Sequence, residues 1–369
     1  MKYRKLGNTD IDVSVICLGT MTFGEQNSQQ EGFDQMDYAV ERGVNFFDTA
    51  ELYAVMPRKE TYGKTEEIVG NWFHERKNRD KIILASKIAS KSDGLEWIRE
   101  GSKSLGFDKK NMNAAIDESL KRLKTDYIDL YQLHWPERKV PKFGILDFEY
   151  DASDNDWTTV EEVLYNLDQL VQAGKIRYAG LSNETPWGVM KYMKISEEKN
   201  LPRMMSIQNV YSLVNRIFDI HNSEVSIREN CGLLAYSPLA GGRLSGKYIG
   251  GKNPPNTRFT LWANRFDRHN TMRGENAIEK YVNLANKHGI APSTFANAFV
   301  NDRPFVTSNI IGATTMEQLK ENIDSIDVTL SNDILKEIED IHLYEIGRAH
   351  VWTPVTDQSR MPSSAWKKK

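Results

Sequence analysis

The sequence contains little cysteine and no long apolar run. Two cysteines in 369 residues, Cys17 and Cys231, are too few for a disulfide framework and lack the spacing of metal ligands. The seven histidines include no H-x-H or H-x-x-x-H pair. No segment approaches the roughly 18 consecutive apolar residues of a membrane span, and the N-terminus lacks the apolar stretch of a secretory signal. These absences predict a metal-free cytoplasmic protein without a membrane segment.

A basic surface and two nucleotide-binding motifs are also missing. The formal net charge is −3 and no basic stripe occurs, which argues against nucleic acid as a partner. No Walker A motif is present, and the residues after the first strand candidate do not match the glycine fingerprint of doubly wound dinucleotide-binding folds. With 40% apolar residues the chain can still bury a large core. The oligomeric state is not readable from the sequence.

The last segment of the chain, residues 345–369, differs in character from the rest. The helical pattern stops near Leu343, and residues 345–356 resemble a translated sequencing adapter. Residues 359–369 resemble the far end of the same adapter running into poly-A, which encodes the final lysines. We therefore predict one domain over residues 1–344 and a non-native, disordered tail over residues 345–369. A genuine disordered tail is the alternative.

What the chain has instead is an alternation of short β-branched runs and amphipathic segments, which is typical of parallel βαβ units. The alternation predicts an α/β fold, a single (β/α)₈ TIM barrel with an N-terminal β-hairpin and long βα loops. The predicted hairpin is Tyr3–Leu6 and Val13–Val15, and the predicted barrel strands are Ile16–Gly19, Asn45–Asp48, Ile82–Ser86, Tyr127–Leu133, Ile176–Ser182, Met205–Gln208, Leu233–Tyr236 and Asn309–Gly312. Helices are predicted at 32–42, 111–123, 160–173 and 316–324 from apolar residues at helical spacing.

Polar residues stand at the ends of the second, third and fourth predicted strands. Asp48 ends the second strand and Tyr53 follows in its loop, while Lys87 and His134 end the next two. Because barrels of this kind carry their active sites at the carboxyl ends of the strands, we expect these side chains to converge. Each residue alone also has a structural explanation, such as a helix cap or a buried ion pair. Their joint placement favours catalysis.

These residue types suit general acid catalysis. A nearby Lys ammonium favours the phenolate form of a tyrosine and lowers its pKa from the usual value of about 10. Asp48 is expected to pair with Lys87 and hold it charged. His134 is expected to donate a hydrogen bond that orients a substrate carbonyl. Tyr53 is therefore the predicted proton donor.

Several motifs contain these residues in a fixed order. They are Phe47-Asp48-Thr49-Ala50-x-x-Tyr53, Glu67-x-x-Gly70, Ala85-Ser86-Lys87, Leu133-His134-Trp135-Pro136, Leu18-Gly19-Thr20-Met21-Thr22-Phe23-Gly24-Glu25-Gln26-Asn27 and Gln208-Asn-x-Tyr-Ser-Leu213. Together they resemble the aldo-keto reductase superfamily, most closely its bacterial Tas-type branch, which is akin to the potassium-channel β-subunit group. The resemblance runs from Tyr3 to about His342 and implies Asp48, Tyr53, Lys87 and His134 as the catalytic tetrad. An insertion at 55–65 departs from the family pattern and is expected to reshape the pocket rim.

A reductase needs a hydride carrier, because side chains cannot supply hydride. The polar ends of strands five to seven can bind a nicotinamide through amide, hydroxyl and ring-stacking contacts from Ser182, Asn183, Gln208 and Tyr236. Backbone N–H groups in the following residues 237–242 can hold a pyrophosphate. Thr314 and Thr315, where a helix begins after strand eight, suit the 2′-phosphate of NADPH.

The family resemblance implies the same contacts and adds others. It implies pyrophosphate contacts at Ser237, Leu239 and Gly241, phosphate contacts at Lys247 and Arg258, and adenosine contacts at Gln318, Glu321 and Asn322, with Gly312 at the end of strand eight in the same site. Lys247 and Arg258 are explained equally well as solvated charges on a long loop. As phosphate ligands they favour NADPH over NADH.

The predicted substrate walls are Phe23, Tyr53, Trp135 and the loop 137–157, and their aromatic rings suit a small or medium carbonyl compound. The predicted function is NADPH-dependent reduction of an aldehyde or ketone, with the proton from Tyr53. One alternative is a cofactor-sensing binding subunit with little turnover. Another is a barrel enzyme such as a phosphosugar isomerase, which needs a Glu base and no nicotinamide. The particular substrate and the physiological direction are not readable.

Overall fold

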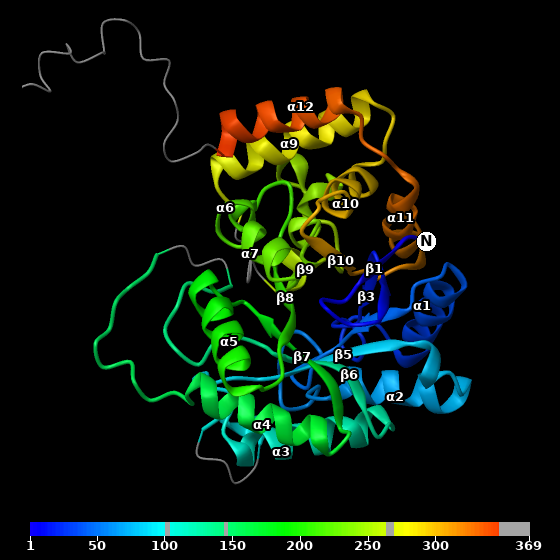
Figure 1. Ribbon diagram of the computed structural model, residues 1–369. Helices are drawn as coiled ribbons and strands as arrows, with labels where there is room; N and C mark the ends of the chain where they lie inside the picture. Colours follow the sequence, from blue (N-terminus) through cyan, green and yellow to red (C-terminus); the bar gives the residue numbers. More distant parts are fainter. Residues whose placement is uncertain (100–103, 144–146, 263–268, 347–369) are drawn as a thin grey trace, which may run out of the picture.

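Eight parallel strands close into a barrel in the computed structural model, which describes residues 1–99, 104–143, 147–262 and 269–346 (Figure 1). The strand order around the barrel is β10-β3-β4-β5-β6-β7-β8-β9. The strands are β3 (Ile16–Gly19), β4 (Phe46–Asp48), β5 (Ile83–Ile88), β6 (Ile128–Leu133), β7 (Ile176–Ser182), β8 (Met204–Val210), β9 (Gly232–Tyr236) and β10 (Val306–Ile311). The predicted (β/α)₈ barrel is confirmed, and each predicted barrel strand overlaps an observed one.

The barrel strands are buried on both faces, which explains their nearly continuous apolar sequences. In β6, Leu130 packs inside the barrel with Phe46 and Leu234, whereas its neighbour Tyr131 packs in the larger core that includes the helices. Because side chains alternate along a strand, Gln132 shares the inward face with Leu130. A polar side chain thus enters the barrel just below the strand end.

Helices surround the barrel (Figure 1). They are α1 (Gln29–Glu41), α2 (Lys64–Arg76), α3 (Lys109–Leu123), α4 (Val160–Gln172), α5 (Pro186–Lys199), α6 (Ile217–His221), α7 (Ser223–Arg228), α8 (Arg258–Leu261), α9 (Met272–Lys287), α10 (Pro292–Asn301), α11 (Met316–Asp324) and α12 (Asn332–Ile341). The first helix begins at Gln29 rather than at the predicted position 32, because Ser28 and Glu31 form a reciprocal capping box. The other predicted helices agree with α3, α4 and α11 to within two residues.

The N-terminal hairpin, β1 (Tyr3–Lys5) with β2 (Asp12–Ser14), covers the end of the barrel where the strands begin. Leu6 and Val13 are fully buried and pack against Ala85 in the barrel interior. Since this end is plugged by apolar side chains, the opposite end, at the carboxyl ends of the strands, is left for a functional site.

The last helix α12 continues into a π-helical turn, His342–Ile346, that packs against α9. Glu345 pairs there with Lys280 of α9. The first two residues of the predicted tail are thus part of this turn, and residues 347–369 lie outside the described residues. In the part of the chain that the structure describes, no helix is long and apolar enough to cross a membrane.

Candidate active site

Neighbouring strand ends bring three members of the predicted tetrad together. Asp48 ends β4, Lys87 lies near the end of β5, and His134 directly follows β6. Lys87 Nζ donates to Asp48 Oδ2 at 2.7 Å and to the Thr49 carbonyl at 2.8 Å. The Lys87 side chain is fully buried, so the ion pair forms away from water. The predicted pairing of Asp48 with Lys87 is confirmed.

The hydroxyl of Tyr53 lies next to this ion pair, and Lys87 Nζ donates to it at 3.2 Å. The loop is tied down because Tyr53 N donates to the Ala50 carbonyl at 3.1 Å and Thr49 N donates to the Ala85 carbonyl of β5 at 2.9 Å. Burial raises the pKa of the Tyr53 phenol above its usual value of 10.0, although the Lys87 ammonium acts in the opposite direction. Lys87 thus has the predicted effect on this pKa, but burial outweighs it and the pKa is raised overall.

The charge states of Lys87 and His134 follow from the same surroundings. Burial acts to lower the pKa of Lys87, but Asp48 and Tyr53 together outweigh it and raise the pKa, so the amine stays charged. Burial and the Lys87 ammonium lower the pKa of His134 well below its usual 6.5. The neutral imidazole carries one N–H donor and lies edge-on to the Tyr53 ring, with 5.8 Å between ring centroids.

Two glutamines inside the barrel complete the surroundings of Asp48. Gln132 Nε2 donates to Asp48 Oδ1 at 3.1 Å, and Gln208 Nε2 donates to the same oxygen at 2.8 Å. Gln208 Nε2 also donates to Gln132 Oε1 at 3.0 Å, so the two amides orient each other. With both of its N–H donors engaged, Gln208 keeps its carbonyl oxygen for a ligand. Gln132 is absent from the predicted site, although a polar residue on the inward face just before His134 is a signal for it.

A cavity of about 1600 Å³ opens above the tetrad. Asp48, Tyr53 and His134 line it, as does the predicted wall residue Trp135. The residues predicted to contact the cofactor all line it too, namely Ser182, Asn183, Gln208, Tyr236, Ser237, Leu239, Gly241, Lys247, Arg258, Gly312, Thr314, Thr315, Gln318, Glu321 and Asn322. The predicted cofactor residues and three of the four predicted catalytic residues therefore line one cavity, which extends from β4 to α11. The fourth, Lys87, is fully buried and contacts Asp48 and Tyr53.

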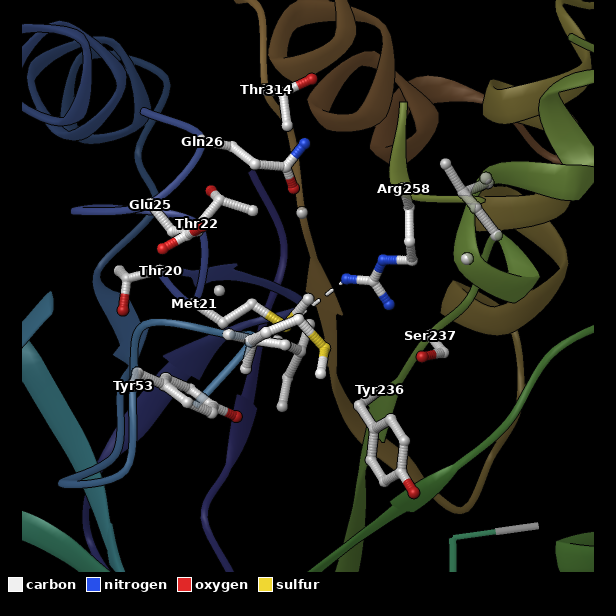
Figure 2. Close-up of a pocket in the computed structure, with 18 of the residues that line it drawn as sticks. Thr20, Met21, Thr22, Glu25, Gln26, Tyr53, Tyr236, Ser237, Arg258 and Thr314 are labelled. Atoms are coloured by element: carbon white, nitrogen blue, oxygen red, sulfur yellow. Dashed lines mark hydrogen bonds between the residues drawn. The ribbon is translucent and has the colours of Figure 1, made fainter. Parts of the chain in front are cut away.

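Near the tetrad, the cavity wall carries amide and aromatic groups. The Tyr236 hydroxyl donates to Asn183 Oδ1 at 2.7 Å, and Asn183 Nδ2 donates to the His134 carbonyl at 2.9 Å. Figure 2 shows Tyr53 and Tyr236 on facing sides of the cavity. Side-chain amides and a flat ring are the groups that a nicotinamide carboxamide and its ring require.

The turn after β9, at residues 237–242, lines the cavity. Its φ angles are positive at Ser237 (57°), Ala240 (50°) and Gly241 (70°). A Cβ on Gly241 would lie 2.7 Å from the Phe259 ring, so only glycine fits there. In the described part of the chain, the N–H groups of Leu239 and Gly241 have no hydrogen-bond partner. Two N–H groups without partners in the same turn can together bind an anion.

Two cations stand beside this turn. Lys247 lines the cavity, and burial together with the nearby Arg258 lowers the pKa of its ammonium. Figure 2 shows the Arg258 guanidinium reaching across the cavity toward Met21, whose sulfur lies 3.8 Å from Nη2. Two like charges at one cavity wall are stabilised by a bound anion.

Helix α11 forms the far end of the cavity. Asn322 Nδ2 donates to the Gly312 carbonyl at 3.1 Å, and Thr314 N donates to Gln318 Oε1 at 3.0 Å. The Thr315 hydroxyl accepts from Gln318 N at 3.3 Å and so caps the helix. A Cβ built on Gly312 would meet no atom within 4 Å, so open space lies over its backbone. With the N–H turn and the two cations, this polar end fits the adenosine side of a nicotinamide dinucleotide.

The Aldo/keto reductase family matches residues 15–342. The chain belongs to this family. An aldo/keto reductase is an oxidoreductase, and the tetrad of this chain lies within the matched residues. The predicted family resemblance is thereby confirmed.

Its relatives in this family include bacterial and fungal proteins. Over 346 residues it is 46% identical to Protein tas of Escherichia coli (strain K12), covering 93% of this chain and 98% of that protein. It is 32% identical over 346 residues to Uncharacterized oxidoreductase YrpG of Bacillus subtilis (strain 168), covering 92% and 96%. It is 28% identical over 363 residues to Norsolorinic acid reductase B of Dothistroma septosporum, covering 95% and 84%. The predicted likeness to the Tas-type branch is confirmed.

One predicted pocket residue of this aldo/keto reductase lies elsewhere. Phe23 is fully buried in the hydrophobic core, and the Thr65 hydroxyl of α2 donates to its carbonyl at 2.7 Å. The chain turns after β3, where Phe23 N donates to the Thr20 carbonyl at 3.0 Å. This turn sends the Phe23 ring into the core and leaves Met21 and Thr22 on the cavity wall. The prediction of Phe23 as a substrate contact is wrong.

Other cavity residues carry no sequence motif that marks them. Ser293 and Asn297 of α10 line the far end, and Asn297 Nδ2 donates to Asn322 Oδ1 at 3.0 Å. From the predicted wall 137–157, Lys142 and Phe143 line the cavity, while residues 144–146 lie outside the described residues. No group of three or more His, Cys, Asp or Glu among the described residues is placed to hold a metal ion.

Proposed function

We propose that this protein reduces a small aldehyde or ketone to an alcohol in the cytoplasm, with NADPH as hydride donor and Tyr53 as proton donor. The observation that carries the proposal is the hydrogen bond from Lys87 to the Tyr53 hydroxyl, at the floor of a cavity large enough for a dinucleotide. Both cysteines are buried free thiols, in keeping with a reducing compartment.

The residues of the chain supply the proton and hold the carbonyl. The raised pKa keeps the Tyr53 phenol protonated at neutral pH, so it can donate to an oxygen that gains charge. Lys87, paired with Asp48, stabilises the phenolate that remains after the transfer. The neutral His134 imidazole offers an N–H to the same carbonyl oxygen. Water then restores the proton on Tyr53.

The cofactor contacts follow from the chemistry of the cavity. A reduced nicotinamide, when bound, supplies the hydride that the carbonyl carbon accepts. Asn183, Gln208 and Tyr236 would hold its carboxamide and ring, and the turn at Leu239 and Gly241 would hold the pyrophosphate. Lys247 and Arg258 favour the extra phosphate of NADPH. Gln318, Glu321 and Asn322 would hold the adenosine.

The names of the relatives agree with a reductase reaction in this family. One bacterial relative is named as an oxidoreductase, and the fungal relatives are named as norsolorinic acid reductases. Those substrates belong to those proteins, and this chain differs from them in most positions. The relatives support the reaction class rather than a particular substrate.

The test measures NADPH oxidation with a panel of aldehydes and ketones, for the wild type and for Tyr53→Phe. We expect turnover by the wild type, a loss of about 10²–10⁴-fold in kcat for the variant, and unchanged NADPH binding in a fluorescence titration. Absence of NADPH binding would reject the proposal. Binding by both proteins, with wild-type turnover no faster than that of Tyr53→Phe, would instead favour a cofactor-sensing subunit.

A further inference from the structure

A row of aromatic rings leads from the tetrad toward the mouth of the cavity. The His134 ring lies 5.8 Å from that of Tyr53, Trp135 lies 4.9 Å from His134, and Phe143 lies 5.6 Å from Trp135. Trp135 is 4% exposed and Phe143 is 38% exposed, so the row runs outward. Trp135 Nε1 donates to the Lys91 carbonyl at 3.0 Å, which fixes the indole. The planes of successive rings meet at 79°, 50° and 65°, so the rings form an apolar wall rather than one flat face. An aromatic or other apolar body can pack against this wall with its carbonyl at Tyr53.

Lys142, the neighbour of Phe143, stands at the outer end of the row. Its Nζ donates to the Pro136 carbonyl at 3.3 Å, and Pro136 directly follows Trp135 in the chain. An ammonium has three N–H donors, and no second hydrogen-bond partner of Lys142 Nζ occurs among the described residues. Lys142 is half-buried and lines the cavity. Burial lowers the pKa of its ammonium, as expected for a charge held away from water.

The other cations at the start of this loop are neutralised by carboxylates. Arg138 pairs with Glu184, and Lys139 pairs with Asp151. Within the described ranges, no carboxylate forms an ion pair with Lys142. The charges of Asp154 and Glu184 act to raise its pKa, but they do not offset its burial and the nearby Arg138. A half-buried ammonium without a carboxylate partner, at the wall of a substrate cavity, is stabilised by an anionic ligand.

We propose that the preferred substrate is an aromatic or other apolar aldehyde or ketone that carries a carboxylate at the end away from the carbonyl, and that Lys142 binds this carboxylate. The inference rests on the proposed reductase function. In this arrangement the aromatic row contacts the body of the substrate, and Tyr53 and His134 contact its carbonyl. Lys142 favours a substrate with a negative charge at the far end.

The test compares a charged and an uncharged substrate, 4-formylbenzoate and its methyl ester. The ester group withdraws more electron density than the carboxylate, so the intrinsic reactivity of the carbonyl favours the ester and works against the predicted preference. We expect kcat/KM for the acid to exceed that for the ester by about tenfold or more, since hydrogen bonds between charged groups are the stronger kind. In Lys142→Met this preference should fall to near unity, through KM rather than kcat, because Lys142 lies away from the reacting atoms. Lys142→Arg should keep most of the preference.

Lys139→Gln is the matched control, because Lys139 lies in the same loop, is exposed, and is already paired with Asp151. It should leave the preference for the acid unchanged. Equal rates for acid and ester, or a preference that survives in Lys142→Met, would overturn the inference while leaving the reductase intact. If neither aldehyde nor any other carbonyl is reduced, the proposed function fails and the inference fails with it.

Discussion

At the floor of the cavity, both oxygens of the Asp48 carboxylate accept hydrogen bonds from side chains inside the barrel, whereas at the rim the Lys142 ammonium donates to one loop carbonyl. Lys87 at the floor is fully buried, while Phe143 at the rim is 38% exposed. The floor is built from strand ends and the rim from loops. We infer that the barrel strands position the groups that transfer the proton, whereas the loops determine which substrate binds.

The largest effect is expected where a charge at the floor loses its partner. Lys87→Met leaves the buried Asp48 carboxylate uncompensated, so the free energy of unfolding should fall by about 3–5 kcal/mol. Turnover should fall by at least about 10²-fold, since the phenolate of Tyr53 loses its cation. Urea denaturation and steady-state kinetics measure the two effects.

Lys91→Met is the control for that change, because Lys91 lies just beyond β5 and pairs with the exposed Asp156. An exposed ion pair contributes about 0–1 kcal/mol, so the stability of this variant should stay close to that of the wild type. Equal losses in both variants would contradict the distinction between floor and rim.

A smaller effect is expected at the glutamine pair. Gln132→Leu removes one donor to Asp48 and leaves a donor of Gln208 without its acceptor, which should lower the free energy of unfolding by about 1–3 kcal/mol. We expect a larger relative decrease in kcat than in the affinity for NADPH, because Asp48 positions Lys87. If kcat stays at the wild-type value while stability falls, Gln132 has a purely structural role.

At the rim, the expected effect moves from stability to substrate binding. Phe143→Ala should change the free energy of unfolding by no more than about 0.5 kcal/mol, since the side chain is partly exposed. KM for aromatic aldehydes should rise severalfold because the outermost ring of the row is lost, while KM for a short aliphatic aldehyde should hardly change. If both KM values rise equally, or if the variant unfolds, Phe143 has a structural role like that of the floor residues and does not select aromatic substrates.

The smallest expected effect is that of pH on reduction. The pKa of Tyr53 is raised above 10.0, so its phenol stays protonated over the usual pH range. The rate should therefore fall only when the pH exceeds the raised pKa of Tyr53. The pKa of His134 is lowered well below 6.5, so its imidazole stays neutral as the pH falls through that value. We therefore expect a flat profile of kcat/KM between about pH 6 and 9. An inflection near 6.5 would show that His134 titrates normally.

The barrel and the tetrad were predictable because both depend on local patterns. β-branched runs separated by helical periodicity predicted the strands, and the motif around Asp48 placed Tyr53 at a strand end. Phe23 was not predictable, since its direction depends on the turn after β3. The pKa of Tyr53 depends on a competition between burial and Lys87 that only the folded surroundings decide.

The most direct test of the proposed reduction follows the hydride from NADPH to the product. The protein is incubated with an aldehyde and NADPH that carries deuterium at both C4 positions of the nicotinamide, and the alcohol is analysed by mass spectrometry. We predict an alcohol with one deuterium on the former carbonyl carbon from the wild type, and far less alcohol from Tyr53→Phe at the same time point. An alcohol without deuterium, or equal amounts of alcohol from the wild type and Tyr53→Phe, would contradict the proposed reduction.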